Sequence, residues 1–187
     1  LWLATLNSAF QTGVKSPLDV AILERKVTGM EECAKTDEIP FDFERRRVTV
    51  ILKRRERFLF VTKGAPEDVL RVCTSCEREQ DDSPAPLDGA SREQALETFR
   101  ALSEQGLRVL AVASRQVTTP SGFTIHDENQ LTLAGFVAFA DPLVDGAADS
   151  IARLREDGVQ VKILTGDNEL VTRYICRQVG LDGDRRA

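Results

Sequence analysis

One short stretch of this chain has residues suited to holding a phosphorylated ligand. Residues 63–67 read K-G-A-P-E and follow the apolar run F-L-F-V at 58–61 closely. A strand ending here would deliver Lys63 to the edge of a sheet, and Gly64, which has no Cβ, would let a ligand approach the backbone. Taken alone, such a lysine is more often a solvated side chain before a turn.

A second candidate lies upstream, where Phe41 is followed by a basic run that includes Arg46. An aromatic ring can stack on a nucleobase, and neighbouring cations can attract phosphates. The alternative is a core phenylalanine beside a solvated charge run.

Several common catalytic patterns are missing from the sequence. It has no phosphate loop of the G-x-x-x-x-G-K-[ST] type, no G-x-G-x-x-G, no G-x-S-x-G and no H-E-x-x-H. Its single histidine, His126, argues against a histidine-based triad. Cys73 and Cys76 form a C-x-x-C pair, but a zinc site would need a second ligand pair, so we expect structural cysteines and no metal site.

The composition sets limits on the class of protein. The 187 residues, 42% hydrophobic and 29% charged, suit a globular chain of one domain, or one domain plus part of another. The net charge of −5 argues against nucleic acid as the main partner, because phosphate neutralisation needs a basic face. No apolar run approaches the ~20 residues of a membrane span, so the chain itself is not expected to insert into a membrane.

The elements that would position these residues can be read from periodicity and turn signals. Ser16 and Pro17 are a typical helix start, as N-cap and first helical residue. Ser91 fits a capping box at the start of another helix. The expected strands are rich in β-branched and aromatic residues and cover 48–52, 58–61, 108–115 and 131–140. The first two are expected to form a hairpin with a polar turn.

The pattern changes at Asp141. A helix over 145–156, a buried strand over 159–164, a polar turn and a second helix to about residue 179 are typical of a parallel α/β sheet. We therefore predict an α+β domain at 1–140, with an antiparallel sheet flanked by helices, followed by a partial α/β segment at 141–187.

Together these pieces resemble the P-type ATPases, cation pumps that form an aspartyl-phosphate. Residues 63–67 look like the K-G-A-P-E motif of their nucleotide-binding domain. Phe41 falls at the position of the adenine-stacking residue and Arg46 at that of a basic residue near the nucleotide. Asp19 matches an acidic position near the adenine amino group, where it would favour adenine over guanine.

The resemblance continues into the later part of the chain. Arg108, in G-L-R-V-L-A, matches an arginine that reaches the phosphates. Asp141 and Pro142 resemble the hinge of the phosphorylation domain, whose core is haloacid-dehalogenase-like, and Thr165, Gly166 and Asp167 resemble its T-G-D motif. The hinge departs from the family pattern, because it lacks the usual second proline and the cation after it.

The segments 6–13 and 162–171 look most like bacterial magnesium-importing members of the family. The resemblance then implies a cytoplasmic ATP-binding domain of an inner-membrane pump, working with ATP and Mg²⁺ and with the pump's remaining phosphorylation, actuator and membrane domains. The phosphorylated aspartate is expected before Leu1, so this chain alone is expected to be inactive. The alternatives are a pump for calcium or protons, a fragment of a haloacid-dehalogenase-like phosphatase, and a stand-alone ATP-sensing module.

Overall fold

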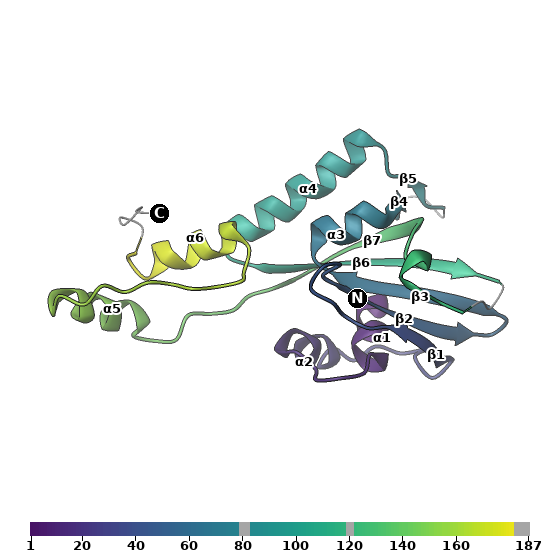
Figure 1. Ribbon diagram of the computed structural model, residues 1–187, viewed down its shortest axis with the longest axis horizontal. Helices are drawn as coiled ribbons and strands as arrows, with labels where there is room; N and C mark the ends of the chain where they lie inside the picture. The colour runs from purple at the N-terminus through teal and green to yellow at the C-terminus, as the bar shows by residue number, and fades with distance from the viewer. Residues whose placement is uncertain (79–82, 119–121, 182–187) are drawn as a thin grey trace. The chain divides into compact units, whose positions relative to one another are not determined.

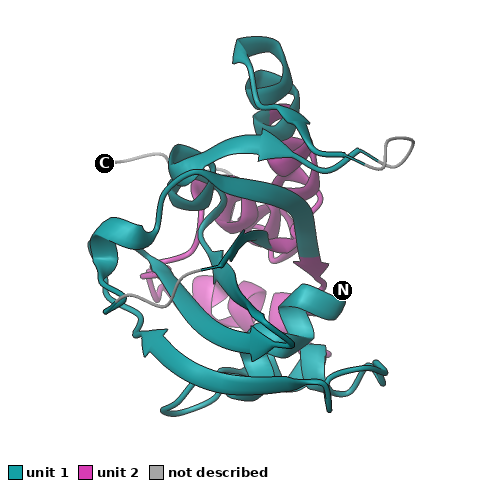
Figure 2. Ribbon diagram, turned by 90° about the vertical axis from the view of Figure 1, so that its right-hand side faces the viewer, with its two compact units in different colours: residues 1–96, 110–137 teal, residues 97–109, 138–187 magenta. Residues whose placement is uncertain are grey.

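A computed structural model describes residues 1–78, 83–118 and 122–181 (Figure 1). By their contacts, the residues form two units, 1–96 with 110–137 and 97–109 with 138–187 (Figure 2). The described helices are α1 (Trp2–Phe10), α2 (Pro17–Leu23), α3 (Pro66–Val72), α4 (Gly89–Glu104), the short 3₁₀ helix η1 (Ile125–Asp127), α5 (Ala147–Glu156) and α6 (Glu169–Gln178). The described strands are β1 (Cys33–Ile39), β2 (Arg47–Arg54), β3 (Arg57–Gly64), β4 (Cys73–Cys76), β5 (Ala85–Pro86), β6 (Arg108–Val117) and β7 (Leu131–Phe139).

The strands of the described residues form one seven-stranded sheet in the order β1-β2-β3-β6-β7-β4-β5. The pairs β1–β2, β2–β3, β3–β6 and β4–β5 are antiparallel, and β4 runs parallel to β7. This mixed architecture confirms the predicted α+β class, with one parallel pair that the sequence did not indicate.

The β2–β3 hairpin carries Lys63 and Gly64 and is confirmed as predicted. Its strands meet through a two-residue turn of Arg55 and Glu56, in which Arg55 takes the left-handed φ of 55°. Successive side chains of a strand point to opposite faces of a sheet. The valines and leucines of one face pack on α1, whereas Ile51 and Phe60 face the other way and pack with Ile39.

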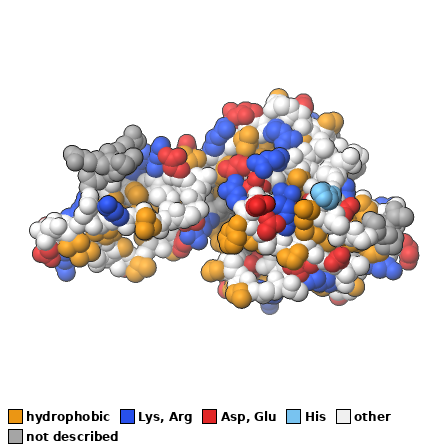
Figure 3. Space-filling view, viewed as in Figure 1, with side chains coloured by type: hydrophobic (Ala, Val, Ile, Leu, Met, Phe, Trp, Pro, Cys, Tyr) orange, Lys and Arg blue, Asp and Glu red, His pale blue; other side chains and the backbone are white. Residues whose placement is uncertain are grey.

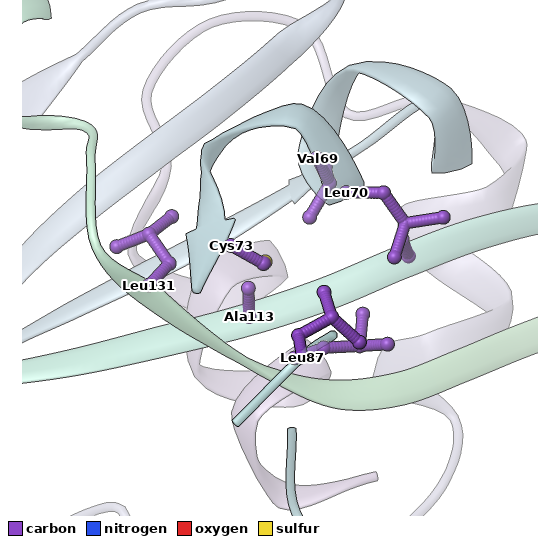
Figure 4. Packing of buried hydrophobic residues seen from close by; sticks show 8 residues of the cluster. Val69, Leu70, Cys73, Leu87, Ala113 and Leu131 are labelled. Carbon is purple, nitrogen blue, oxygen red and sulfur yellow. The ribbon is translucent and has the colours of Figure 1, made fainter. Parts of the chain in front are cut away.

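A third apolar cluster fixes α3, which directly follows the K-G-A-P-E motif. Val69 and Leu70 of α3 pack on Ala111 and Ala113 of β6, together with Leu131 of β7 (Figure 4). Since Ala113 pairs with Thr62, α3 covers the face of the sheet opposite to the one on which Lys63 and α1 lie. Gly64 therefore stands at the point where the chain passes from β3 to this opposite face.

One predicted helix start needs correction. The helix α4 begins at Gly89, so Ser91 is not its N-cap: the backbone N–H of Ser91 donates to Asp88 Oδ1 at 2.8 Å, and Asp88 satisfies the helix start instead. Cys73 is the C-cap residue of α3 and also the first residue of strand β4, which ends at Cys76.

The strand predicted over 159–164 is also wrong. In the second unit these residues have no regular secondary structure, and Leu164 is 96% exposed. A strand exists only by hydrogen bonding to a neighbour. The described residues of 138–181 offer no partner strand for it, so the apolar run has no ladder to join. The predicted boundary at Asp141 and the haloacid-dehalogenase-like character of this segment stay predictions.

Candidate functional site

Lys63 lies near the end of β3 and points toward α1 and α2. Only 5% of the residue is exposed. Its Nζ donates to Ser8 Oγ at 2.7 Å and to the Asp19 carboxylate. The lysine that the sequence placed at a sheet edge is thus a buried ammonium group, anchored by two helices.

Asp19 is the partner that fixes this ammonium. It is the third residue of α2 and forms a capping box with Ser16, whose backbone N–H and Oγ both donate to Asp19 Oδ2 at 3.0 and 2.7 Å. Its Oδ1 accepts from Ser8 Oγ at 2.8 Å and from Lys63. A carboxylate offers about four acceptor sites, so a further bond to an adenine amino group would require one of these to be exchanged.

The electrostatics of the pair follow from its burial. Burial alone would raise the pKa of Asp19, but hydrogen bonds from Lys63, Ser16 and Ser8 and the charge of Lys63 together lower this pKa well below its ordinary value. Burial also lowers the pKa of Lys63, and the hydrogen bond and charge of Asp19 only partly offset that effect. The carboxylate is therefore firmly ionised, and the ammonium depends on it.

The structure gives a reason why position 64 requires glycine, and the sequence did not show this reason. A Cβ at this position would lie 2.4 Å from the carbonyl oxygen of Arg46 and 2.6 Å from the Cα of Arg47. Gly64 pairs with Arg47, and the next backbone N–H, of Ala65, donates to the Arg46 carbonyl at 2.9 Å. Gly64 therefore allows the close approach of the neighbouring strand, and the approach of a ligand to this backbone stays a prediction.

Arg46 adjoins Gly64 and has an unusual backbone. Its φ of 45° lies in the left-handed region, which is uncommon for an arginine. Its Nε donates to Asp68 Oδ2 at 2.6 Å, and the side chain is 53% exposed. The guanidinium therefore stands at the surface with one buried carboxylate behind it, so its other donors can reach a ligand.

Phe41 lies on the connection between β1 and β2 and is 51% exposed. Its ring meets that of Phe43 edge-on, with centroids 5.4 Å apart and an interplanar angle of 84°. Phe43 is 89% exposed. The core alternative for Phe41 is therefore wrong, and the ring offers an open face to a flat ligand.

The structure places the other predicted residues in the second unit. Arg108 Nη2 lies 2.7 Å from Asp167 Oδ2 and 3.7 Å from Asp141 Oδ2. The backbone N–H of Asp167 donates to Thr165 Oγ1 at 3.1 Å, and a Cβ added at Gly166 would meet no described atom within 4 Å. Arg108 thus joins the hinge aspartate to the T-G-D turn.

The sequence did not single out three residues that hold the site together. Ser8 forms hydrogen bonds with both Lys63 and Asp19. Asp68 accepts a hydrogen bond from Arg46. Glu128 accepts from Arg45 and Arg47, the two arginines on either side of Arg46. A signal for Ser8 was its place beside Asn7 in a helix whose other residues, apart from Thr5, are apolar. Among the described residues, no three His, Cys, Asp or Glu side chains group as a metal site.

Charged side chains of both signs are spread over the visible surface (Figure 3). Lys and Arg side chains are interleaved with Asp and Glu side chains over the face shown in Figure 3, rather than gathered into one basic surface. No helix within the described ranges has both the length and the apolar character needed to cross a bilayer.

Comparison with known families gives the class. Residues 11–145 match the family model described as "P-type ATPase, cytoplasmic domain N". This range includes Asp19, Phe41, Arg46, Lys63 and Gly64, whose geometry is given above. The chain therefore belongs to the P-type ATPase family and contains its cytoplasmic N domain.

Individual relatives refine this. The chain is 41% identical to "Magnesium-transporting ATPase, P-type 1" of Salmonella typhimurium and of Escherichia coli, in each case over 96% of this chain. It is 29% identical to "Calcium-transporting ATPase 1" of Bacillus cereus over 97% of the chain. The chain spans about a fifth of the length of these curated relatives.

Proposed function

We propose that this chain binds ATP and serves as the cytoplasmic nucleotide-binding domain of a magnesium-transporting P-type ATPase in a bacterial inner membrane. Family membership and the two magnesium-transporting relatives support the class and the ion. The observation that carries the ATP site is the exposed ring of Phe41, which meets the exposed ring of Phe43 edge-on, so that two aromatic side chains are grouped at one place on the surface.

The division of labour follows from the contacts. Phe41 stacks on the adenine, and Phe43 supports its ring from the edge. Base–aromatic stacking contributes about 1–3 kcal/mol. The exposed guanidinium of Arg46 faces the phosphates with charge-assisted hydrogen bonds. Gly64 keeps the β2 and β3 backbones close enough for the Arg46 carbonyl to accept from the backbone N–H of Ala65.

Lys63 and Asp19 form the floor of the site rather than its open wall. Their ion pair ties β3 to α1 and α2, with Ser8 between the helices. In this proposal Asp19 selects adenine either directly, by exchanging one of its bonds, or through the placement of Lys63. A weaker response to GTP than to ATP is expected in both cases.

Arg108, Asp141, Thr165, Gly166 and Asp167 belong to the phosphoryl-transfer region in this proposal. Arg108 supplies positive charge for the phosphates, and the hinge at Asp141 and Pro142 brings the nucleotide to an aspartate outside this chain. Mg²⁺ would enter with the phosphates of ATP, and the remaining phosphorylation, actuator and membrane domains of the pump would complete the cycle. Phosphoryl transfer depends mainly on such positioning and charge neutralisation.

The test is calorimetric titration of the chain with ATP, AMP and GTP, together with Phe41→Ala. Loss of stacking should raise the Kd for ATP by about 5- to 150-fold. The matched control is Ile125→Ala, because Ile125 is exposed to the same extent, 52% against 51%, and should bind like the wild type. Equal affinities for Phe41→Ala and the wild type, or release of phosphate from ATP by the chain alone, would contradict the proposal.

A further inference from the structure

Glu128 is a buried carboxylate to which the proposed ATP site gives no role in binding the nucleotide. Glu128 follows η1 in the connection between β6 and β7, and its side chain is 0% exposed. An ionised carboxylate in such a place is strongly unfavourable unless charged or hydrogen-bonding partners surround it. Its partners therefore indicate what it is there to hold.

Those partners all come from the beginning of β2 and the residues just before it. Glu128 Oε2 accepts from Arg45 Nη1 at 2.5 Å and from Arg47 Nε at 3.0 Å. Glu128 Oε1 accepts from Thr49 Oγ1 at 2.5 Å, and Thr49 is within 2.8 Å of Thr62 Oγ1 in β3. A single carboxylate thus binds three side chains of one segment from about 80 positions away.

Arg45 extends this hold to the segment that carries Phe41. Its Nη2 donates to the carbonyl of Pro40 at 2.5 Å, and its Nε donates to the Asp42 carboxylate. Asp42 Oδ1 in turn accepts from the backbone N–H of Arg45 at 2.7 Å. The residues immediately before and after Phe41 are both tied to Arg45, and Arg45 is tied to Glu128.

The same carboxylate holds the residues on both sides of Arg46. Arg45 and Arg47 flank it, and both bind Glu128 Oε2. Arg46 lies between these two held residues and has a left-handed φ of 45°, and its own backbone N–H donates to the Asp42 carbonyl at 2.8 Å. The side chain of Arg46 does not join Glu128, and its Nε donates to Asp68 instead.

Glu128 is itself held firmly. Thr124 and Asp127 form a capping box over η1, and Arg115 donates to the Asp127 carbonyl at 2.7 Å and to Asn129 Oδ1 at 3.1 Å. Arg115 comes from β6, a central strand of the sheet. The carboxylate is therefore presented from a fixed support.

We propose that Glu128 is a positioning residue for nucleotide binding, which orders residues 40–47 so that Phe41 and Arg46 are set before the nucleotide arrives. Ordering a binding segment in advance raises affinity, because the entropic cost of ordering is not left to the binding step. This inference rests on the proposed ATP site and adds a residue that touches no ligand.

The test compares Glu128→Gln, which keeps the size of the side chain and removes its charge, with the wild type. The Kd for ATP should rise about three- to tenfold, and hydrogen exchange of the amides in 40–47 should become faster. If Glu128 acts through the stacking segment, adding Glu128→Gln to Phe41→Ala should weaken binding less than it does in the wild type.

The control is Leu52→Ala, which opens a cavity at the other end of β2. Leu52→Ala should lower the urea midpoint at least as much as Glu128→Gln does, yet leave the Kd for ATP unchanged. If Glu128 only stabilised the fold, Glu128→Gln and Leu52→Ala would bind ATP with equal affinity. If Glu128→Gln does not fold, Arg45→Lys replaces it, because lysine keeps the charge but cannot join Glu128, Asp42 and Pro40 at once; it should weaken ATP binding to the same extent.

The outcomes separate the two proposals. Wild-type affinity in Glu128→Gln, or in Arg45→Lys where the former does not fold, with weakened binding in Phe41→Ala, overturns the role of Glu128 and leaves the ATP site standing. Wild-type affinity in Phe41→Ala overturns the ATP site itself.

Discussion

The buried pair of Lys63 and Asp19 makes Asp19→Asn an informative perturbation of the site. The two side chains are only 5% and 6% exposed, so the ammonium would stay desolvated after losing its counter-charge. Removing one partner of a buried ion pair costs about 3–5 kcal/mol. Asparagine keeps one oxygen acceptor, and the pKa of Lys63 is already lowered by burial, which eases loss of its proton. We therefore expect a loss in unfolding free energy near the lower limit, about 3 kcal/mol.

The reverse change should be milder. In Lys63→Met the Asp19 carboxylate keeps its donors from Ser8 and Ser16, so the loss should be about 2 kcal/mol. In the double variant neither charge is left unpaired. The loss of unfolding free energy in the double variant should therefore be smaller than the sum of the two single losses by at least about 1 kcal/mol, as is found for residues in direct contact.

Urea unfolding followed by the fluorescence of Trp2 measures these losses. Trp2 is the single tryptophan of the chain and lies on α1, the helix that carries Ser8. The matched control is Glu32→Gln, which breaks an ion pair with Arg54 whose side chains are 45% and 43% exposed. Such a surface pair contributes about 0–1 kcal/mol. Additive losses, with Asp19→Asn no worse than the control, would refute the reasoning.

Two further predictions concern Gly64 and acid. Gly64→Ala should lower the unfolding free energy by about 1–3 kcal/mol, because the added Cβ would meet the Arg46 backbone. The control is Gly89→Ala, which should not destabilise the fold because a Cβ there has open space. Equal urea midpoints for the two variants would contradict this prediction. The folded-state pKa of Asp19 lies below its ordinary value, so this carboxylate stabilises the fold above about pH 4, and the contribution is lost as the pH falls below that value. Urea unfolding at several pH values should therefore show a steeper acid loss in the wild type than in Asp19→Asn, and parallel curves would argue against the pair.

Features that depend on neighbouring residues were open to prediction. Ser16 and Pro17 start a helix because a side-chain cap and a fixed φ act within a few residues. The hairpin of β2 and β3 follows from two β-branched and aromatic runs separated by a short polar turn. The K-G-A-P-E motif and Phe41 were found by their residue types and by resemblance.

Features that depend on residues far apart in the sequence could not be predicted. The bond between Lys63 and Ser8 joins residues 55 positions apart, and Glu128 meets Arg45 across 83 positions. No periodicity or cap marks such partners. The strand predicted over 159–164 failed for the same reason, since its apolar run meets the local requirement for a strand but has no neighbour among the described residues.

The opening motif shows where this division falls. The sequence by itself determined that a lysine and a glycine end a strand and precede a helix, because propensity and turn chemistry are local. Only the tertiary structure decided that Lys63 is a buried ammonium paired with Asp19 and that Gly64 is required by Arg46 and Arg47. Burial and pairing are set by which elements pack together, and that packing brings in residues from the whole chain.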